Sequence, residues 1–289
     1  MGGERRVGIP WRTRDGRFSP FKLAVFLALF LPALWLVFRA FGGAGGLGPR
    51  PYMEAIHRSG DWAVRLWLIS LALTPFRHML RLPALALVRR MIGVAVFAYA
   101  ALHVTLYTVD LAGDLGKVAS EIWLRFYLTI GFVALLGLLA LAATSTDGML
   151  RRLGGRAWRG LHRLTYPLAA LALWHFGLQS KLEVSEPMVM IGLTLWVLLL
   201  RWPAARTGWG LALSLPLVVL ATAGIEAAWY AVRSGAPLTA ILGANLMTGL
   251  GLRPAHWVAL LVGAAILLVG LARLRPVAPV RRRRLSEVP

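Results

Sequence analysis

Cysteine is absent from this 289-residue chain, which excludes disulfides, thiolate metal sites and thiol catalysis. Any metal ligands must therefore be histidine, methionine or carboxylate side chains. Acidic residues are also scarce, since 12 aspartates and glutamates stand against 32 lysines and arginines and leave a net charge of +20. The basic residues fall in short clusters between apolar runs and do not form one face, so we expect them to set membrane topology, with no nucleic-acid partner.

Charged residues make up only 15% of the chain, apolar residues make up 58%, and the mean hydropathy is +0.67. This composition predicts an all-α integral membrane protein in a lipid bilayer. A helix needs about 20 apolar residues to cross roughly 30 Å of hydrocarbon. We expect about eight transmembrane helices, at residues 21–41, 60–78, 90–109, 122–143, 159–179, 186–202, 209–232 and 254–274.

Lysine and arginine concentrate in every second loop, as they do in cytoplasmic loops. The pattern predicts that both termini are cytoplasmic. The pair Arg5 and Arg6 is interpreted as part of this positive-inside anchor and not as a twin-arginine export signal. The next apolar run begins fifteen residues later and is too long for a signal peptide.

A break at TGWG (207–210) divides the apolar segments. We predict a basic N-terminal tail (1–20), a six-helix core (21–202), a two-helix C-terminal extension (203–275) and a basic C-terminal tail (276–289). Glu226 lies in the middle of an extension helix. Such a carboxylate usually pairs with a polar neighbour, and we favour that interpretation over proton or quinone chemistry.

Three histidines lie in the apolar segments, namely His103, His162 and His175, whereas His57, His78 and His256 lie at helix ends or in loops. A rise of about 1.5 Å per residue places His103 roughly 9 Å and His175 roughly 6 Å from the outer ends of their helices. Their rings can therefore meet at one depth. His162 lies thirteen residues before His175, about 20 Å closer to the cytoplasm, which is close to the spacing of two stacked cofactors.

Two imidazoles on opposite sides of a haem iron close its coordination and leave an electron carrier. The other N–H of each ring needs an acceptor, for which Thr105, Thr165 and backbone carbonyls are candidates. The plain alternative is that each histidine hydrogen-bonds a neighbouring helix. On one straight helix His162 and His175 would point about 140° apart, so a shared face would require a kink near Pro167.

The run FYLTIGFVALLGLLALAATSTDGMLRRLGGRAWRGLHRLTYPLAALALWHFGLQSK (126–181) resembles the haem-binding membrane subunit of the periplasmic methionine-sulfoxide reductase system, the MsrQ family. That family belongs to the ferric-reductase-like transmembrane group. Further similar stretches are LPALWLVFRAFGG (31–43), HRSGDWAVRLWLISLALTPFR (57–77) and RRMIGVAVFAYAALHVTLY (89–107). The resemblance covers about residues 20–202.

The resemblance implies a core that binds b-type haem through His103, His162 and His175. The wider group carries a fourth such histidine, and the corresponding position here is Arg89 or Arg90. Either only an outer haem between His103 and His175 is fully ligated, or His162 holds an inner haem with an unusual partner such as Arg89. A protonated arginine is a poor ligand, which favours an anchoring or propionate-binding role. One or two haems are therefore expected.

The resemblance also implies an electron-transfer subunit, not the catalytic subunit, in the bacterial inner membrane. Its electrons would come from a cytoplasmic flavin reductase or a quinol, with flavin mononucleotide (FMN) as a candidate cofactor. They would pass to MsrP, a periplasmic molybdopterin enzyme that reduces oxidised methionines. The alternative is a ferric-reductase or oxidase type of membrane protein with a separate flavoprotein donor, because this sequence has no dinucleotide-binding G-x-G-x-x-G after a strand. A transporter is disfavoured because no inverted repeat is visible.

Overall fold

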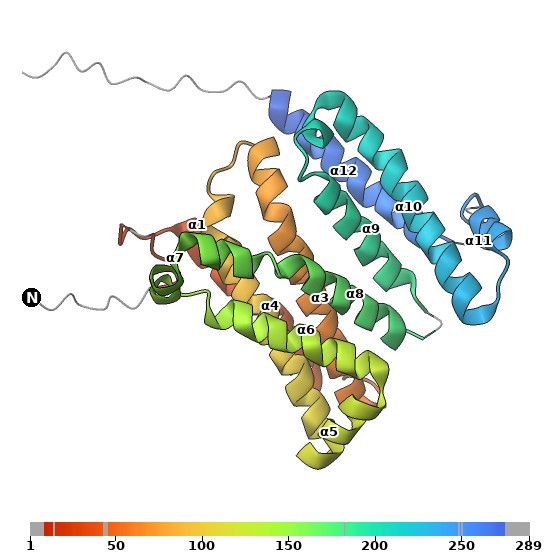
Figure 1. Ribbon diagram of the computed structural model, residues 1–289, viewed down its shortest axis with the longest axis horizontal. Coiled ribbons are helices and arrows are strands. Elements are labelled where there is room, and N and C mark those ends of the chain that lie inside the picture. Colours follow the sequence, from red (N-terminus) through yellow and green to blue (C-terminus); the bar gives the residue numbers. More distant parts are fainter. Residues whose placement is uncertain are drawn as a thin grey trace, which may run out of the picture.

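The computed structural model describes residues 9–13, 15–42, 46–181, 183–247, 249 and 251–274. This part of the chain is helical apart from turns and one isolated bridge between Arg12 and Phe18 (Figure 1). The helices are α1 (Pro20–Ala28), α2 (Leu31–Phe41), α3 (Pro51–Met79), α4 (Leu85–Asp110), α5 (Leu115–Leu124), α6 (Phe126–Ala143), α7 (Asp147–His162), α8 (Thr165–Gln179), α9 (Ser185–Leu199), the 3-10 helix η1 (Ala204–Arg206), α10 (Gly208–Ser234), α11 (Leu238–Ala244) and α12 (Pro254–Leu274). The expected C-terminal tail, with the arginines at 281–284, lies outside the described residues, as do residues 1–8 and 14 of the N-terminal tail, which include Arg5 and Arg6.

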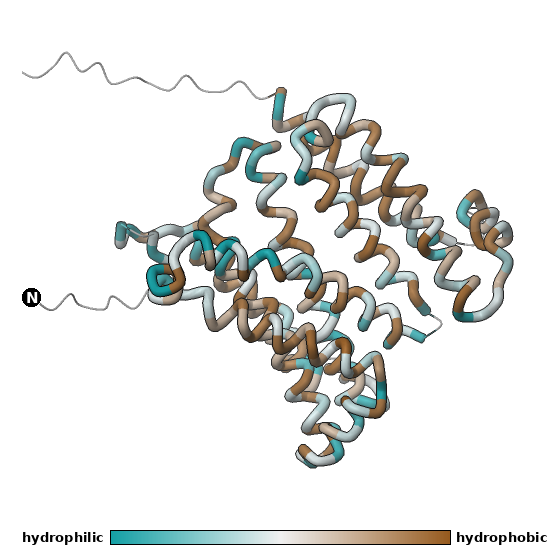
Figure 2. Tube along the Cα trace, in the orientation of Figure 1, coloured by the Kyte–Doolittle hydropathy of each residue, from teal (hydrophilic) through white to brown (hydrophobic). Residues whose placement is uncertain are grey.

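In the part of the chain that the structure describes, five helical segments are long and apolar enough to cross a membrane. They are Pro20–Phe41, Leu85–Asp110, Phe126–Ala143, Gly208–Ser234 and Pro254–Leu274. Figure 2 shows brown, hydrophobic residues along much of the helical bundle. The all-α multi-pass membrane architecture is thereby confirmed. The other three expected spans differ: 60–78 lies within the longer, partly charged α3, 186–202 corresponds to the shorter apolar α9, and 159–179 is divided between two helices.

The first span bends where α1 meets α2, and a side chain from α4 stabilises the bend. The Tyr99 hydroxyl donates a hydrogen bond to the carbonyl of Leu29 (2.7 Å) and accepts one from the backbone N–H of Ala33 (3.1 Å). These two backbone groups would bond to each other in a continuous helix. The inserted hydroxyl therefore satisfies both groups at a kink next to Pro32.

Two antiparallel helix pairs form the part of the bundle that contains His103 and His175. The first pair is α3 with α4, and the second is α6 with α8, which lie next to each other in Figure 1. Glycines allow close approach in the second pair: a Cβ at Gly137 would lie 2.3 Å from the side chain of Leu168. The packing between the helices is dominated by buried aliphatic side chains and by Trp67, which is 5% exposed.

The segment expected as a fifth span, 159–179, does not form one helix. The chain turns at Arg163 and Leu164, between the end of α7 and the start of α8. α7 begins after Thr146, whose hydroxyl accepts a hydrogen bond from the backbone N–H of Met149 (3.1 Å), and it bends at Gly154, where φ is 75°. With its arginines, α7 is too polar for a span. The expected 140° conflict between His162 and His175 therefore does not arise.

α9 and η1 connect the first helices to α10 and α12, which pack side by side with α9 (Figure 1). Glu226 of α10 is 2% exposed, and its carboxylate accepts hydrogen bonds from Arg253 Nη2 (2.7 Å) and Asn245 Nδ2 (3.1 Å). The expectation that Glu226 pairs with polar neighbours is confirmed. The division into a core at 21–202 and an extension at 203–275 stays a prediction.

Candidate functional site

His103 of α4 is oriented by the first turns of α3. Its Nδ1 lies 2.7 Å from the backbone carbonyl oxygen of Ile56, which makes Nδ1–H the donor and leaves the lone pair on Nε2. The ring also packs on Gly60, where a Cβ would lie 3.0 Å from Nδ1 and 3.2 Å from Cε1. Ser59, which is fully buried, hydrogen-bonds the same Ile56 carbonyl (2.9 Å) and so helps to fix this acceptor.

His175 of α8 has the same arrangement against α6. Its Nδ1 lies 2.7 Å from the carbonyl oxygen of Tyr127, and its ring packs on Gly131, where a Cβ would lie 2.8 Å from both Nδ1 and Cε1. The Tyr127 ring stacks beside the imidazole, with centroids 6.4 Å apart. His175 therefore also presents Nε2 as its free lone pair.

The two ring centroids lie 6.3 Å apart, and the ring planes are at 86° to each other. Two metal–nitrogen bonds to imidazole of about 2 Å each would separate the coordinating nitrogens by about 4 Å. One ring radius at each end accounts for the rest of the 6.3 Å. This spacing and the two free Nε2 atoms fit a metal ion held between opposite axial imidazoles, as in a haem with two histidine ligands.

Gly60 and Gly131 occupy equivalent places in the two arrangements, and sequence reasoning missed both. Each lies four residues after the residue whose carbonyl accepts the imidazole bond, in IHRSG (56–60) and YLTIG (127–131). In a helix, the side chain at i+4 lies next to the carbonyl of residue i. A glycine there opens that carbonyl to a ring from the neighbouring helix. A glycine that faces an intramembrane histidine could have indicated these two positions. Finding it requires knowledge of which helices pair.

The two threonines suggested as acceptors for the imidazole rings form hydrogen bonds with other groups. The Thr105 hydroxyl donates to the carbonyl of Ala101 within its own helix (2.9 Å). Thr165 accepts a hydrogen bond from the indole Nε1 of Trp67 (3.0 Å). The backbone carbonyls, which were the other candidates, hold both rings. A buried carbonyl has a second lone pair available for this purpose.

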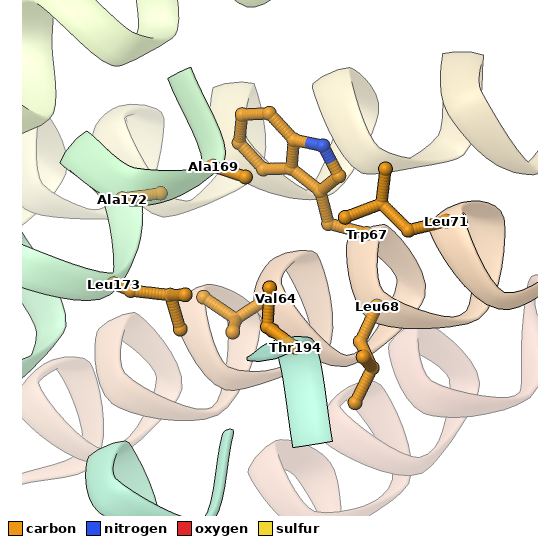
Figure 3. Close-up of a pocket in the computed structure, with 8 residues that line it drawn as sticks. All are labelled: Val64, Trp67, Leu68, Leu71, Ala169, Ala172, Leu173 and Thr194. Carbon is orange, nitrogen blue, oxygen red and sulfur yellow. The ribbon is translucent and has the colours of Figure 1, made fainter. Parts of the chain in front are cut away.

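Trp67 lies beside a narrow crevice between α3, α8 and α9 (Figure 3). The crevice is lined by Val64, Trp67, Leu68, Leu71, Ala169, Ala172, Leu173 and Thr194. Its volume is only about 10 Å³, which is about the space of one water molecule. The interior next to α8 is thus filled by side chains on this side.

His162 has a different environment from the other two histidines. It ends α7, outside the long apolar segments, and its ring stacks on Trp158 with centroids 3.9 Å apart. Its Nε2 lies 3.2 Å from the Thr144 hydroxyl, and Trp158 Nε1 donates to the Thr144 carbonyl (2.9 Å). Burial, followed by the positive charges of Arg89 and Arg90, lowers the pKa of His162. The contact between Nε2 and the Thr144 hydroxyl would have to break before this nitrogen could bind iron.

The arginines that stand in place of a fourth histidine also have other surroundings. Arg90 Nη1 bonds to Asp147 Oδ1 (2.7 Å), which connects the start of α4 to the start of α7. Arg89 is exposed. The structure therefore brings His103 and His175 together, whereas His162 lies apart from that pair in contact with Trp158.

Comparison with known proteins gives the family. The family model described as "Ferric reductase like transmembrane component" matches residues 59–173, which include His103 and His162 and end two residues before His175. The protein-methionine-sulfoxide reductase heme-binding subunit MsrQ of Rhodospirillum rubrum is 41% identical over 187 residues, or 64% of this chain and 89% of that protein. The chain belongs to the MsrQ family. The MsrQ subunit of Caulobacter vibrioides is 38% identical over 188 residues, or 63% of this chain and 87% of that protein.

The chain is also similar to a protein that is not named MsrQ. The magnetosome protein MamZ of Magnetospirillum gryphiswaldense is 38% identical over 197 residues, which is 65% of this chain but only 30% of MamZ. No solved structure matches the chain. About a third of the chain stays unmatched by each of these MsrQ relatives and by MamZ.

Proposed function

We propose that this protein is a membrane electron-transfer subunit that binds haem b between His103 and His175. The observation that carries the proposal is the pair of imidazoles 6.3 Å apart, each with Nδ1 bonded to a backbone carbonyl. Such a haem passes single electrons and has no open position for oxygen or a substrate. The names of the MsrQ relatives, which are heme-binding subunits, support the same cofactor.

The protein's own residues supply ligation and orientation at this site. Ile56 and Tyr127 fix the tautomer of each ring through their carbonyls, so that Nε2 is the ligating atom. Gly60 and Gly131 leave the space that each ring occupies. We propose one haem at this position, because His162 is occupied by Trp158 and Thr144 and Arg90 pairs with Asp147.

We further propose that the protein lies in the bacterial inner membrane with both termini in the cytoplasm. The haem then lies toward the periplasmic side, because α4 and α8 run from the arginine-rich end to the end that carries the pair. Electrons would enter from a cytoplasmic flavin reductase or a quinol, with FMN as a candidate carrier. They would leave to the periplasmic molybdopterin enzyme MsrP for repair of oxidised methionines. The relatives' names favour this role over that of a free-standing ferric reductase.

Haem content tests the ligand assignment directly. We expect purified protein from haem-replete cells to give a reduced-minus-oxidised b-type spectrum with one haem per chain. H103A and H175A should each lose this signal, and H162A should keep it as the matched control. An unchanged spectrum in H175A, or no haem in the wild type, would overturn the proposal.

Electron transfer to the proposed partner, MsrP, is tested by a second experiment. Reduced protein mixed with MsrP and a methionine sulfoxide should reoxidise faster than with either alone. Asp110, Asp114, Glu121, Glu183 and Glu186 make the outer loops acidic, so the rate should fall as salt rises. Reoxidation that needs no MsrP would instead support a free-standing reductase.

A further inference from the structure

A cavity of about 250 Å³ lies at the end of the bundle opposite to the histidine pair. Its walls come from the end of α3, the η1 turn and the end of α12, and are formed by His78, Met79, Pro203, Arg206, Thr207 and Arg273. Gly60, which contacts His103, lies eighteen residues before His78 on α3, or roughly 27 Å along the helix. This junction pocket, formed by the six residues above, lies where α3 meets the C-terminal helices, and it is separate from the proposed haem site.

The junction pocket is lined by two arginines that form no ion pair with the described part of the chain. The ion pairs in the described part of the chain use Arg58, Arg65, Arg90, Arg125 and Arg253. Arg206 and Arg273 therefore have no carboxylate partner among the described residues. Within the described part of the chain they bond to backbone carbonyls: Arg273 Nη2 to Arg206 (2.8 Å) and Arg206 Nη2 to Arg201 (3.2 Å).

An unsatisfied donor adds to this imbalance. The Nε of Arg206 is buried and has no hydrogen-bond partner among the residues that the structure describes. A buried N–H without an acceptor is costly, and adjacent guanidinium groups attract an anion. Guanidinium groups are well suited to phosphate because their N–H groups match its oxygens.

Two tryptophans place the junction pocket at the level of lipid headgroups. Trp202 and Trp209 flank the η1 segment and are 67% and 84% exposed. Exposed tryptophans of membrane proteins gather at the boundary between hydrocarbon and water. The apolar run of α12 ends beside Arg273, at the same boundary.

We propose that the junction pocket binds the phosphate of an anionic phospholipid, with Arg206 and Arg273 as its ligands. The open pocket admits a headgroup while the acyl chains remain in the bilayer. Both arginines come from the segment after residue 202, so the site belongs to the connection between core and extension. The bound lipid would neutralise the two charges and hold α12 against the end of α3.

Lipid binding to the full-length protein tests the proposal. Delipidated wild type in detergent is titrated with phosphatidylglycerol, with phosphatidylcholine and with inorganic phosphate, and bound lipid is counted by native mass spectrometry. We expect phosphatidylglycerol to bind more tightly than phosphatidylcholine. The double variant R206Q/R273Q should weaken that binding at least about tenfold, because it removes both charge-assisted hydrogen bonds to the phosphate.

Two controls separate binding from folding and from general charge. R151Q/R152Q removes the same charge from exposed arginines of α7 and should bind phosphatidylglycerol as the wild type does. R206K/R273K keeps the charge and should retain most of the binding. If R206Q/R273Q does not fold, the single variant R273Q, at an exposed helix end, replaces it and should show a smaller loss.

Three results would overturn the proposal. The first is equal binding of phosphatidylglycerol and phosphatidylcholine by the wild type. The second is equal loss in R206Q/R273Q and R151Q/R152Q. The third is inorganic phosphate binding that depends on Arg206 and Arg273 without any phosphatidylglycerol binding, which would identify a soluble phosphate as the ligand.

Discussion

The imidazole of His175 lies so close to Gly131 that a Cβ at that position would stand 2.8 Å from two ring atoms. G131A must therefore displace the ring or separate α6 from α8. We expect the variant to purify with much less haem than the wild type, measured by pyridine haemochrome, and G60A to show a smaller loss because its contact is 3.0 Å.

G224A and G263A provide matched controls, because a Cβ at either position meets nothing within 4 Å. Both glycines lie inside apolar helices, α10 and α12, where alanine improves helix propensity by up to about 1 kcal/mol. They should keep full haem content. Equal haem content in G131A and G263A would show that the close contact at Gly131 is unimportant.

The 86° angle between the His103 and His175 rings predicts a spectroscopic signature. With perpendicular planes, each imidazole interacts with a different iron d orbital, and the two orbitals stay nearly equal in energy. The ferric protein should then give a highly anisotropic low-spin electron paramagnetic resonance signal at low temperature. A well-resolved rhombic signal, which is typical of parallel rings, would contradict this geometry.

Removing the buried carboxylate of Glu226 should destabilise the C-terminal helices without affecting haem. E226A leaves Arg253 without its partner in a mostly buried place, which costs about 3 kcal/mol in comparable pairs. The measurement is the thermal midpoint followed by circular dichroism, together with the haem spectrum. The double variant E226M/R253M removes both charges and should recover most of the lost stability. No recovery would mean that the two residues act separately.

The membrane fold and the meeting of His103 with His175 could be predicted from sequence because both depend on simple lengths. Apolar runs set the helices, and the rise per residue sets the depth of each histidine. The pairing of Glu226 was predictable for a similar reason, since an isolated charge in an apolar helix needs a partner.

Other features depend on which helices pack against each other, and this pairing cannot be read from the sequence alone. Ile56 and Tyr127 contribute only carbonyl oxygens, so their side chains give no indication of a role. The break at Arg163 and Leu164 was missed because the hydropathy of the segment rises gradually. Trp158 stacks on His162 from one turn earlier in the same helix, α7, and this contact removes the apparent symmetry between His162 and His175.

Each imidazole takes its acceptor from the helix it pairs with, Ile56 of α3 for His103 and Tyr127 of α6 for His175. Half of the site is thus complete within residues 51–110, before the second hairpin has been synthesised. Insertion into the bilayer can therefore deliver two preformed half-sites, and closing them around a cofactor requires little further ordering of either ligand.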